Sequence, residues 1–275
     1  MEKTKNSKLK LYNVLLLICL YLISASIPFS LFIKNEEISY GLTILFRLSF
    51  ILYYPFYIRK NNLDKLEFKR PRLYHFLFIP FLLITISNYI VALIDDSILN
   101  LDISSMFIIK EAILYLLVGI GEEEVFRGVL LPFINEKNSR FKAILYSSLI
   151  FGGVHLLNIS SLSSIPYCLL QALYSFGTGL LFAFIYVYSK NIIYPIIVHF
   201  LFDLLNGSLI EEMFVIEWNL TFFIVNIAIA LLICAYACAL YFIFERRKKD
   251  VSDTLDNWYI YGMYGIWNSM CSISF

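Results

Sequence analysis

The sequence predicts an all-α protein: a polytopic membrane bundle of about eight transmembrane helices with both termini in the cytoplasm. Of the 275 residues, 60% are hydrophobic, and the mean hydropathy is +0.74. Soluble domains contain roughly 45–50% apolar residues. Apolar stretches recur along the chain at lengths that suit a helix crossing a bilayer. The lysines and arginines gather in alternate connecting segments, which is typical of a protein oriented in a membrane.

Eight apolar stretches define the predicted spans. The first follows a basic arm, but it is long and has no small-residue cleavage site, so it predicts an uncleaved helix rather than a signal peptide. The fifth and seventh are short for a full span, and the seventh suits a tilted or partly re-entrant helix. The spans are expected at about 11–32, 40–58, 74–94, 106–133, 143–157, 165–188, 192–205 and 219–244.

The positive-inside rule orients these spans. With the N-terminus inside, 18 of the 22 Lys and Arg residues fall in cytoplasmic segments and only Lys34 falls outside. The other three basic residues, Arg47, Lys110 and Arg127, lie within spans. This imbalance predicts that both termini lie in the cytoplasm.

We expect one structural domain, because the sequence shows no repeat, long linker or low-complexity segment. Within it we distinguish N-terminal helices (1–105), a central part (106–206), a C-terminal helix with a basic flank (207–250) and an aromatic tail with no clear span (251–275). The five cysteines are odd in number and scattered, which argues against a disulfide framework. A net charge of +1 gives no reason to expect a nucleic-acid partner.

The fourth span contains an unusual run of charge, Glu122-Glu123-Glu124-Val125-Phe126-Arg127. Ionised groups at membrane depth cost several kcal/mol each unless they are paired or hydrated, so they mark function by default. Glu123 and Arg127 are four residues apart and can pair on one helix face. We expect Glu124 to be structural, pairing with Arg127 or facing a loop.

Two of the three histidines lie in later spans. Phe151 and His155 share one helix face at i,i+4 spacing, and so do His199 and Asp203. Asn206 falls on the same face as His199, seven residues on. Such polar stripes on apolar helices must face inward, away from lipid.

A depth estimate brings these residues together. At ~1.5 Å rise per residue, Glu122 and His155 each lie roughly 18 Å from the connecting loop between their helices. On the same scale His199 lies roughly 14 Å, and Asp203 roughly 20 Å, from the loop at Lys190. We therefore expect one shared site, reached from the cytoplasmic side.

A glutamate with two histidines supports more than one chemistry. A desolvated carboxylate can take a proton from water and return it, while a histidine orients that water. Alternatively, Glu122, His155, His199 and Asp203 could hold a divalent metal, with zinc the first choice. The sequence has no H-E-x-x-H or G-x-S-x-G motif. The cofactor is therefore either absent or a metal.

Three motifs occur in order on successive helices: Glu122-Glu123-x-x-x-Arg127, Phe151-x-x-x-His155 and His199-x-x-x-Asp203. This pattern resembles the CPBP family of CAAX prenyl protease 2-like enzymes and bacteriocin-processing or immunity proteins, also called Abi proteins. The resemblance covers about 106–206 and implies that this central part is the catalytic core.

The resemblance implies roles for individual residues. Glu122 would be the water-activating base, and Glu123 would support the site with Arg127. His155 and His199 would bind or orient water and the scissile carbonyl, with Phe151 supporting them. The last position is often Asn in the family but is Asp203 here, which leaves Asn206 as an alternative source of the amide.

The resemblance implies an intramembrane endopeptidase in the cell membrane. Its partners would be the lipid bilayer and a peptide or membrane-anchored substrate, such as a CAAX-like, bacteriocin or signal peptide. Two alternatives stay open: a non-catalytic bacteriocin self-immunity or scaffold protein of the same fold, and a proton-coupled transporter. The oligomeric state is not indicated.

Overall fold

The structure is a computed structural model that describes residues 2–63, 66–69, 86, 89–90, 92–93, 102–214 and 220–271. Within this part the regular elements are helices. An isolated antiparallel β-bridge pairs Phe68 with Asn191, both in connecting segments. The expected third span, 74–94, falls almost wholly outside the described residues.

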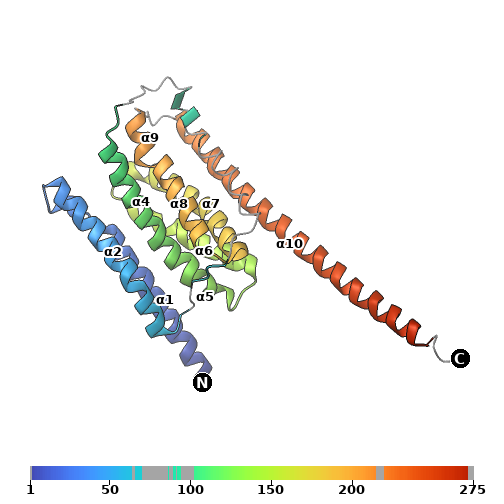
Figure 1. Cartoon of the computed structure of the whole chain (residues 1–275). Helices are drawn as coiled ribbons and strands as arrows, with labels where there is room; N and C mark the ends of the chain where they lie inside the picture. Colours follow the sequence, from blue (N-terminus) through green and yellow to red (C-terminus); the bar gives the residue numbers. More distant parts are fainter. Residues whose placement is uncertain are drawn as a thin grey trace.

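Helices α1 (Glu2–Ser26) and α2 (Glu36–Asn61) form an antiparallel pair against one side of the bundle (Figure 1). Asn35 begins α2 by accepting a hydrogen bond from the Ile38 amide, as expected of an N-cap. Asn62 ends α2 in a left-handed conformation, φ 51°. The two helices share an apolar core with the segment that contains the charged run: Val14, Leu17, Ile18, Tyr21, Phe50, Tyr54, Tyr57, Val125, Phe126 and Val129.

The charged run lies where one helix changes its winding. Helix α4 spans Ser105–Val125, α5 spans Leu131–Asn135, and Phe126–Leu130 between them forms a π-helical turn. The Leu131 amide donates to the Phe126 carbonyl, five residues back. Single π-helical turns inside α-helices occur frequently at functional sites.

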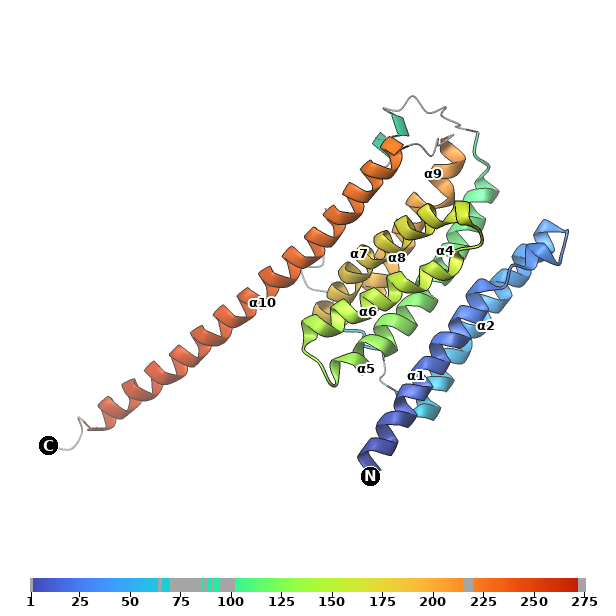
Figure 2. The ribbon, with the colours of Figure 1, turned by 180° about the vertical axis from the view of Figure 1, so that it is seen from behind.

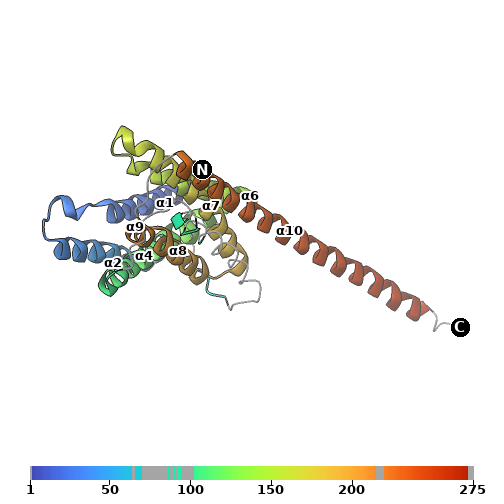
Figure 3. The same ribbon diagram turned by 90° about the horizontal axis from the view of Figure 1, so that it is seen from above.

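The second half of the bundle comprises α6 (Arg140–Val154), α7 (Ile165–Ser189), α8 (Ile193–Asn206), α9 (Ser208–Met213) and α10 (Leu220–Cys271). Helix α7 is its centre, because it packs against α6, α8 and α10. Figures 1 and 2 show α4, α6, α7 and α8 lying side by side in the middle of the bundle. The first part of helix α10 packs along α7, and its C-terminal part extends well beyond the other helices (Figures 1 and 3). The shared core comprises Leu180, Leu181, Phe182, Ala183, Phe184, Val198, Ile229, Ile233 and Ala237.

Polar contacts define two ends of the bundle. At one end, called the basic end here, Lys10 pairs with Glu136, Lys190 with Glu67 at 2.9 Å, and Arg140 with Glu245 at 2.6 Å. At the opposite end Lys110 pairs with Glu37 at 2.5 Å. Helices α4, α7 and α10 run toward the basic end, and α6 and α8 run away from it. Described basic residues at the basic end include Lys10, Arg59, Lys60, Lys69, Lys137, Arg140, Lys142, Lys190 and Arg246.

The predicted all-α membrane bundle is confirmed, and the chain is an integral membrane protein by its apolar helices. Four helical segments in the described part are long and apolar enough to cross a membrane: Leu9–Ser26, Glu36–Asn61, Leu162–Ser189 and Leu220–Arg246. Helix α4 carries five charged residues, and α6 and α8 have only 15 and 14 residues. The number of eight spans and the orientation of the termini stay predictions. The segment 251–271, for which the sequence showed no clear span, continues α10 as helix.

Candidate active site

Glu122 lies in the last turn of α4 and is held between two neighbours. Tyr21 on α1 donates a hydrogen bond from Oη to Glu122 Oε1 at 2.9 Å, and His199 Nε2 lies 3.5 Å from Glu122 Oε2. A Cβ atom on Gly121 would lie 2.8 Å from Cε2 of Tyr21. Glycine at this position therefore lets the Tyr21 ring approach α4 closely enough to reach the carboxylate.

Glu123 and Arg127 form the predicted ion pair. Arg127 Nη1 donates to Glu123 Oε1 at 2.9 Å, and the two side chains are 1% and 0% exposed. Arg127 Nη2 also donates to the Gly179 carbonyl at 3.2 Å, and the guanidinium lies 4.3 Å from the Phe151 ring centre. These contacts compensate the cost of burying both charges.

His199 connects the two glutamates. Its Nδ1 lies 2.9 Å from Glu123 Oε1, and because this carboxylate already accepts from Arg127, Nδ1 is assigned as the donor. Its Nε2 lies 3.3 Å from Asp203 Oδ2 as well as facing Glu122. The predicted contact between His199 and Asp203 is confirmed. The imidazole stacks on Phe182, with ring centres 4.8 Å apart, which fixes its plane.

His155 lies at the C-terminal end of α6, where the helix tightens into a 3-10 turn. Its ring meets the Phe151 ring edge to face at 5.4 Å, so the predicted i,i+4 contact is confirmed. Its Nε2 atom is buried without a hydrogen-bond partner among the described groups. An unpartnered buried nitrogen is costly, which indicates that it serves a water molecule or a ligand.

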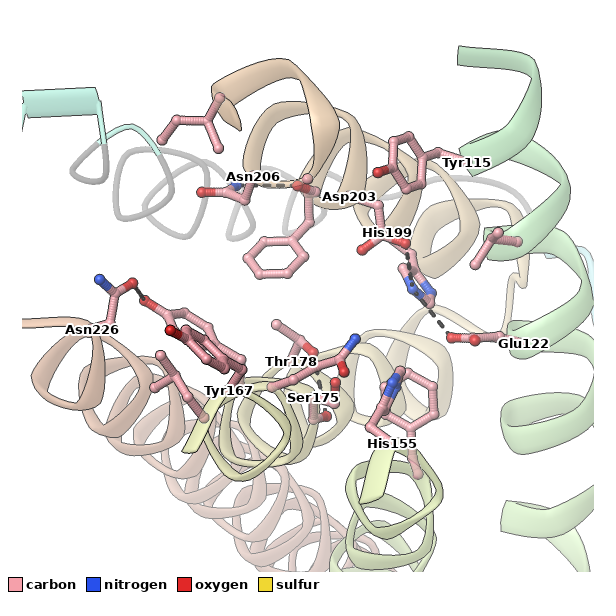
Figure 4. Close-up of a pocket in the computed structure, with 18 of the residues that line it drawn as sticks. Tyr115, Glu122, His155, Tyr167, Ser175, Thr178, His199, Asp203, Asn206 and Asn226 are labelled. Carbon is pink, nitrogen blue, oxygen red and sulfur yellow. Dashed lines mark hydrogen bonds and ion pairs between the residues drawn. The ribbon is translucent and has the colours of Figure 1, made fainter. Parts of the chain in front are cut away.

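One cavity of about 380 Å³ joins these groups. Glu122, His155, His199 and Asp203 all line it, and Figure 4 shows the first three facing the same part of the cavity. The predicted convergence of three motifs from α4, α6 and α8 is therefore confirmed as geometry.

The cavity extends in one direction relative to the basic end, whereas the expected access from the cytoplasmic side stays a prediction like the orientation of the termini. From the motif residues the cavity extends away from the basic end, past Gln171, Phe222 and Asn226 near the starts of α7 and α10. On the basic side, the buried side chains Phe126, Arg127 and Phe182 lie beneath the site. The depth estimate could not predict this direction, because rise per residue gives the level of a group and says nothing of which side is packed shut.

The expectation for Glu124 needs correction, and the amide role expected of Asn206 stays a prediction. Glu124 does not face a loop: it is buried, and its Oε2 has no hydrogen-bond partner among the described groups. Asn206 lines the cavity, but its amide donates to the Phe202 carbonyl of its own helix at 3.1 Å. Asn206 also lies about 10 Å further along α8 than His199, at ~1.5 Å per residue, so it does not share the level of Glu122.

The structure adds residues that the sequence reasoning missed. Tyr21 comes from the first helix, and no motif or spacing links it to Glu122. The polar wall of the cavity on α7 does have a signal, because its members recur on one helix face at i, i+4, i+7, i+8 and i+11. They are Tyr167, Gln171, Tyr174, Ser175 and Thr178, and Tyr174 donates to Asn226 of α10 at 3.0 Å.

The donor arrangement does not fit the metal alternative. In the part of the chain that the structure describes, no group of three or more His, Cys, Asp or Glu side chains is arranged to hold a metal ion. His199 directs both ring nitrogens at carboxylates instead of leaving one for a metal. We therefore derive no step through a metal ion.

Comparison with known proteins agrees with the three motifs. Residues 104–205 match the family model described as type II CAAX prenyl endopeptidase Rce1-like, which confirms the resemblance to the CPBP family. No curated protein matches the chain. The match supports a membrane-embedded protease of the CAAX type in general.

Proposed function

We propose that this protein is an intramembrane endopeptidase of the cell membrane that hydrolyses a peptide bond with water activated by Glu122. The observation that carries the proposal is the cavity in which Glu122, His155 and His199 meet, with His155 Nε2 buried and without a hydrogen-bond partner among the residues that the structure describes. The catalytic core is the segment 106–206 in a multi-pass bundle. The substrate is a peptide or a membrane-anchored segment, of which a bacteriocin or signal peptide is an example.

Glu122 acts as the general base. It takes a proton from a water molecule as the water oxygen bonds to the scissile carbonyl carbon. It then gives this proton to the amide nitrogen as the C–N bond breaks, which releases a carboxyl and an amine product. The hydrogen bond from Tyr21 and the contact with His199 hold the carboxylate toward the cavity.

The histidines have different tasks. His155 presents Nε2, which no described group engages, so it binds the water or the carbonyl oxygen. His199 is fixed by Glu123 through Nδ1, by Phe182 through stacking and by Asp203 through Nε2. Glu123 and Arg127 are positioning residues in this mechanism, because Glu123 is completely buried and acts on His199.

The test is cleavage of candidate peptides by purified protein in lipid nanodiscs. Glu122→Gln, His155→Ala and His199→Ala should each lower kcat/KM by about 10²–10⁴-fold, the usual range for a general acid or base. If all three variants cleave at the wild-type rate, the mechanism is wrong. If the protein is instead a non-catalytic scaffold or immunity protein of the same fold, the Glu122→Gln variant should protect cells as well as the wild type does.

Metal analysis separates the two forms of the chemistry. A chelator that removes divalent ions should leave cleavage unchanged if Glu122 works on water alone. Stoichiometric zinc in the purified protein, with activity lost on chelation and restored by zinc, would overturn the metal-free mechanism.

A further inference from the structure

The cavity and the basic residues lie toward opposite ends of the bundle. Along α7, the cavity-lining side chains change from 38% exposed at Tyr167 to 2% at Thr178, in the direction of the basic end. Along α8 the same change runs from the half-buried Asp203 to His199, which is 3% exposed. On α7 and α8, two of the helices that line the cavity, exposure therefore rises toward the end away from the basic residues, and the mouth lies at that end.

The floor of the cavity is closed toward the basic end. Phe126 and Phe151 meet edge to face at 5.0 Å, and Arg127 lies between Phe151 and Phe182 at 4.3 and 5.4 Å from their ring centres. All four side chains are buried. A substrate that approaches from the basic end would have to displace this packed layer and the Glu123–Arg127 pair within it.

The mouth is bordered by the connecting segment after α6 and by polar side chains of α7 and α10. Helix α6 ends at Val154, directly before His155, so the site lies close to the connecting segment that follows. In this segment Asn158 donates to Gln171 at 3.0 Å, and Leu162 and Ser163 are exposed. Across the cavity Asn226 of α10 accepts from Tyr174.

The charge imbalance assigns these ends to the two sides of the membrane. The basic end holds nearly all described Lys and Arg residues, whereas Lys34 and Lys110 lie toward the opposite end. Basic connecting segments remain in the cytoplasm under the positive-inside rule. The basic end is therefore cytoplasmic, and the mouth of the cavity faces the other side.

We propose that the catalytic cavity opens on the non-cytoplasmic face of the membrane and takes a peptide segment that reaches it from that side. The nature of the occupant rests on the proposed protease function, but the direction of opening does not. The substrate class is accordingly an exported peptide, or the outward-facing end of a membrane-anchored chain.

Cysteine labelling of the full-length protein in intact cells tests the direction. The five native cysteines are replaced by alanine, and single cysteines are introduced as Ser175→Cys in the cavity, Ser163→Cys beside its mouth and Asn138→Cys at the basic end. The probe is a small, membrane-impermeant thiosulfonate added outside the cells. Gln171→Cys, at an exposed position on the cavity wall, serves as a second cavity reporter if Ser175→Cys does not accumulate.

The proposal expects Ser163→Cys and the cavity cysteine to react before the cells are permeabilised, and Asn138→Cys to react only afterwards. The reverse pattern would overturn it. A cavity cysteine that stays unreactive in both conditions while Ser163→Cys reacts would also overturn it, because the cavity would then have no aqueous mouth. Adding Glu122→Gln should leave the labelling pattern unchanged, so a failure of the catalytic mechanism is distinguishable from a failure of the direction.

Discussion

Replacing Tyr21 by Phe tests whether the first helix takes part in catalysis. The substitution removes only the hydroxyl that donates to Glu122 Oε1 at 2.9 Å, and it keeps the ring that packs against Phe50 at 5.3 Å. A hydrogen bond to a charged group contributes about 1.5–3 kcal/mol. If the bond holds Glu122 in its reactive position, kcat/KM should fall by roughly 10- to 150-fold, since 1.36 kcal/mol corresponds to tenfold.

Tyr57→Phe is the matched control. Tyr57 is also buried, and its hydroxyl donates to the Asn13 carbonyl at 2.9 Å, within the same pair of helices but away from the cavity. Both variants should lose similar thermal stability, so only Tyr21→Phe should lose activity beyond that shared effect. The assay is peptide cleavage in nanodiscs beside a thermal unfolding curve. Wild-type kcat/KM in Tyr21→Phe, or an equal loss in Tyr57→Phe, would refute the positioning role.

Three further predictions follow from the same contacts. Glu123→Gln leaves the buried Arg127 without its ion partner and should destabilise the protein by about 3–5 kcal/mol, seen as a lower Tm; an unchanged Tm would contradict the role of the pair. Gly179→Ala places a methyl group 3.0 Å from Phe151 Cδ1 and 3.4 Å from Arg127 Nη2, and should cost about 1–3 kcal/mol. Gly153→Ala is its control, because nothing lies within 4 Å of that added atom, and an equal loss in both variants would show that helix packing at Gly179 is not the cause. Asp203→Asn keeps a polar group beside His199 Nε2 and should retain cleavage within about tenfold, whereas Asp203→Ala should lose more in the same kinetic assay; equal losses would mean that the carboxylate charge itself is required.

Much of the helical framework could be predicted from hydropathy. The expected spans 40–58 and 165–188 lie inside α2 and α7, and the described part of 219–244, from Leu220 on, lies inside α10. The helices run past the predicted ends because polar residues such as Arg59 and Lys60 continue a helix beyond its apolar stretch. The short helix α9 had no such signal. The change of winding after Val125 also has no hydropathy signature, since a π-helical turn depends on how the helix packs.

The charged and histidine side chains that line the candidate site could be selected from the sequence, because polar groups are conspicuous within apolar spans. Charge and imidazole are costly in an apolar span, so Glu122, His155 and His199 stand out without a structure. The i,i+4 spacing also correctly predicted the Glu123–Arg127 and His199–Asp203 contacts. Spacing within one helix is decided by helical geometry alone, which is why these local predictions succeeded.

Contacts between helices are decided by packing, so they could not be predicted from residue spacing along the chain. By itself the sequence determined the membrane class and the three motifs, and through the resemblance it led to the prediction of Glu122 as the base. Only the tertiary structure brought Tyr21 to Glu122, placed both nitrogens of His199 against carboxylates and left His155 Nε2 without a partner in the described part of the chain. It also decided which side of the site is closed, because the layer of Phe126, Arg127, Phe151 and Phe182 comes from separate helices whose side chains meet only in the folded bundle.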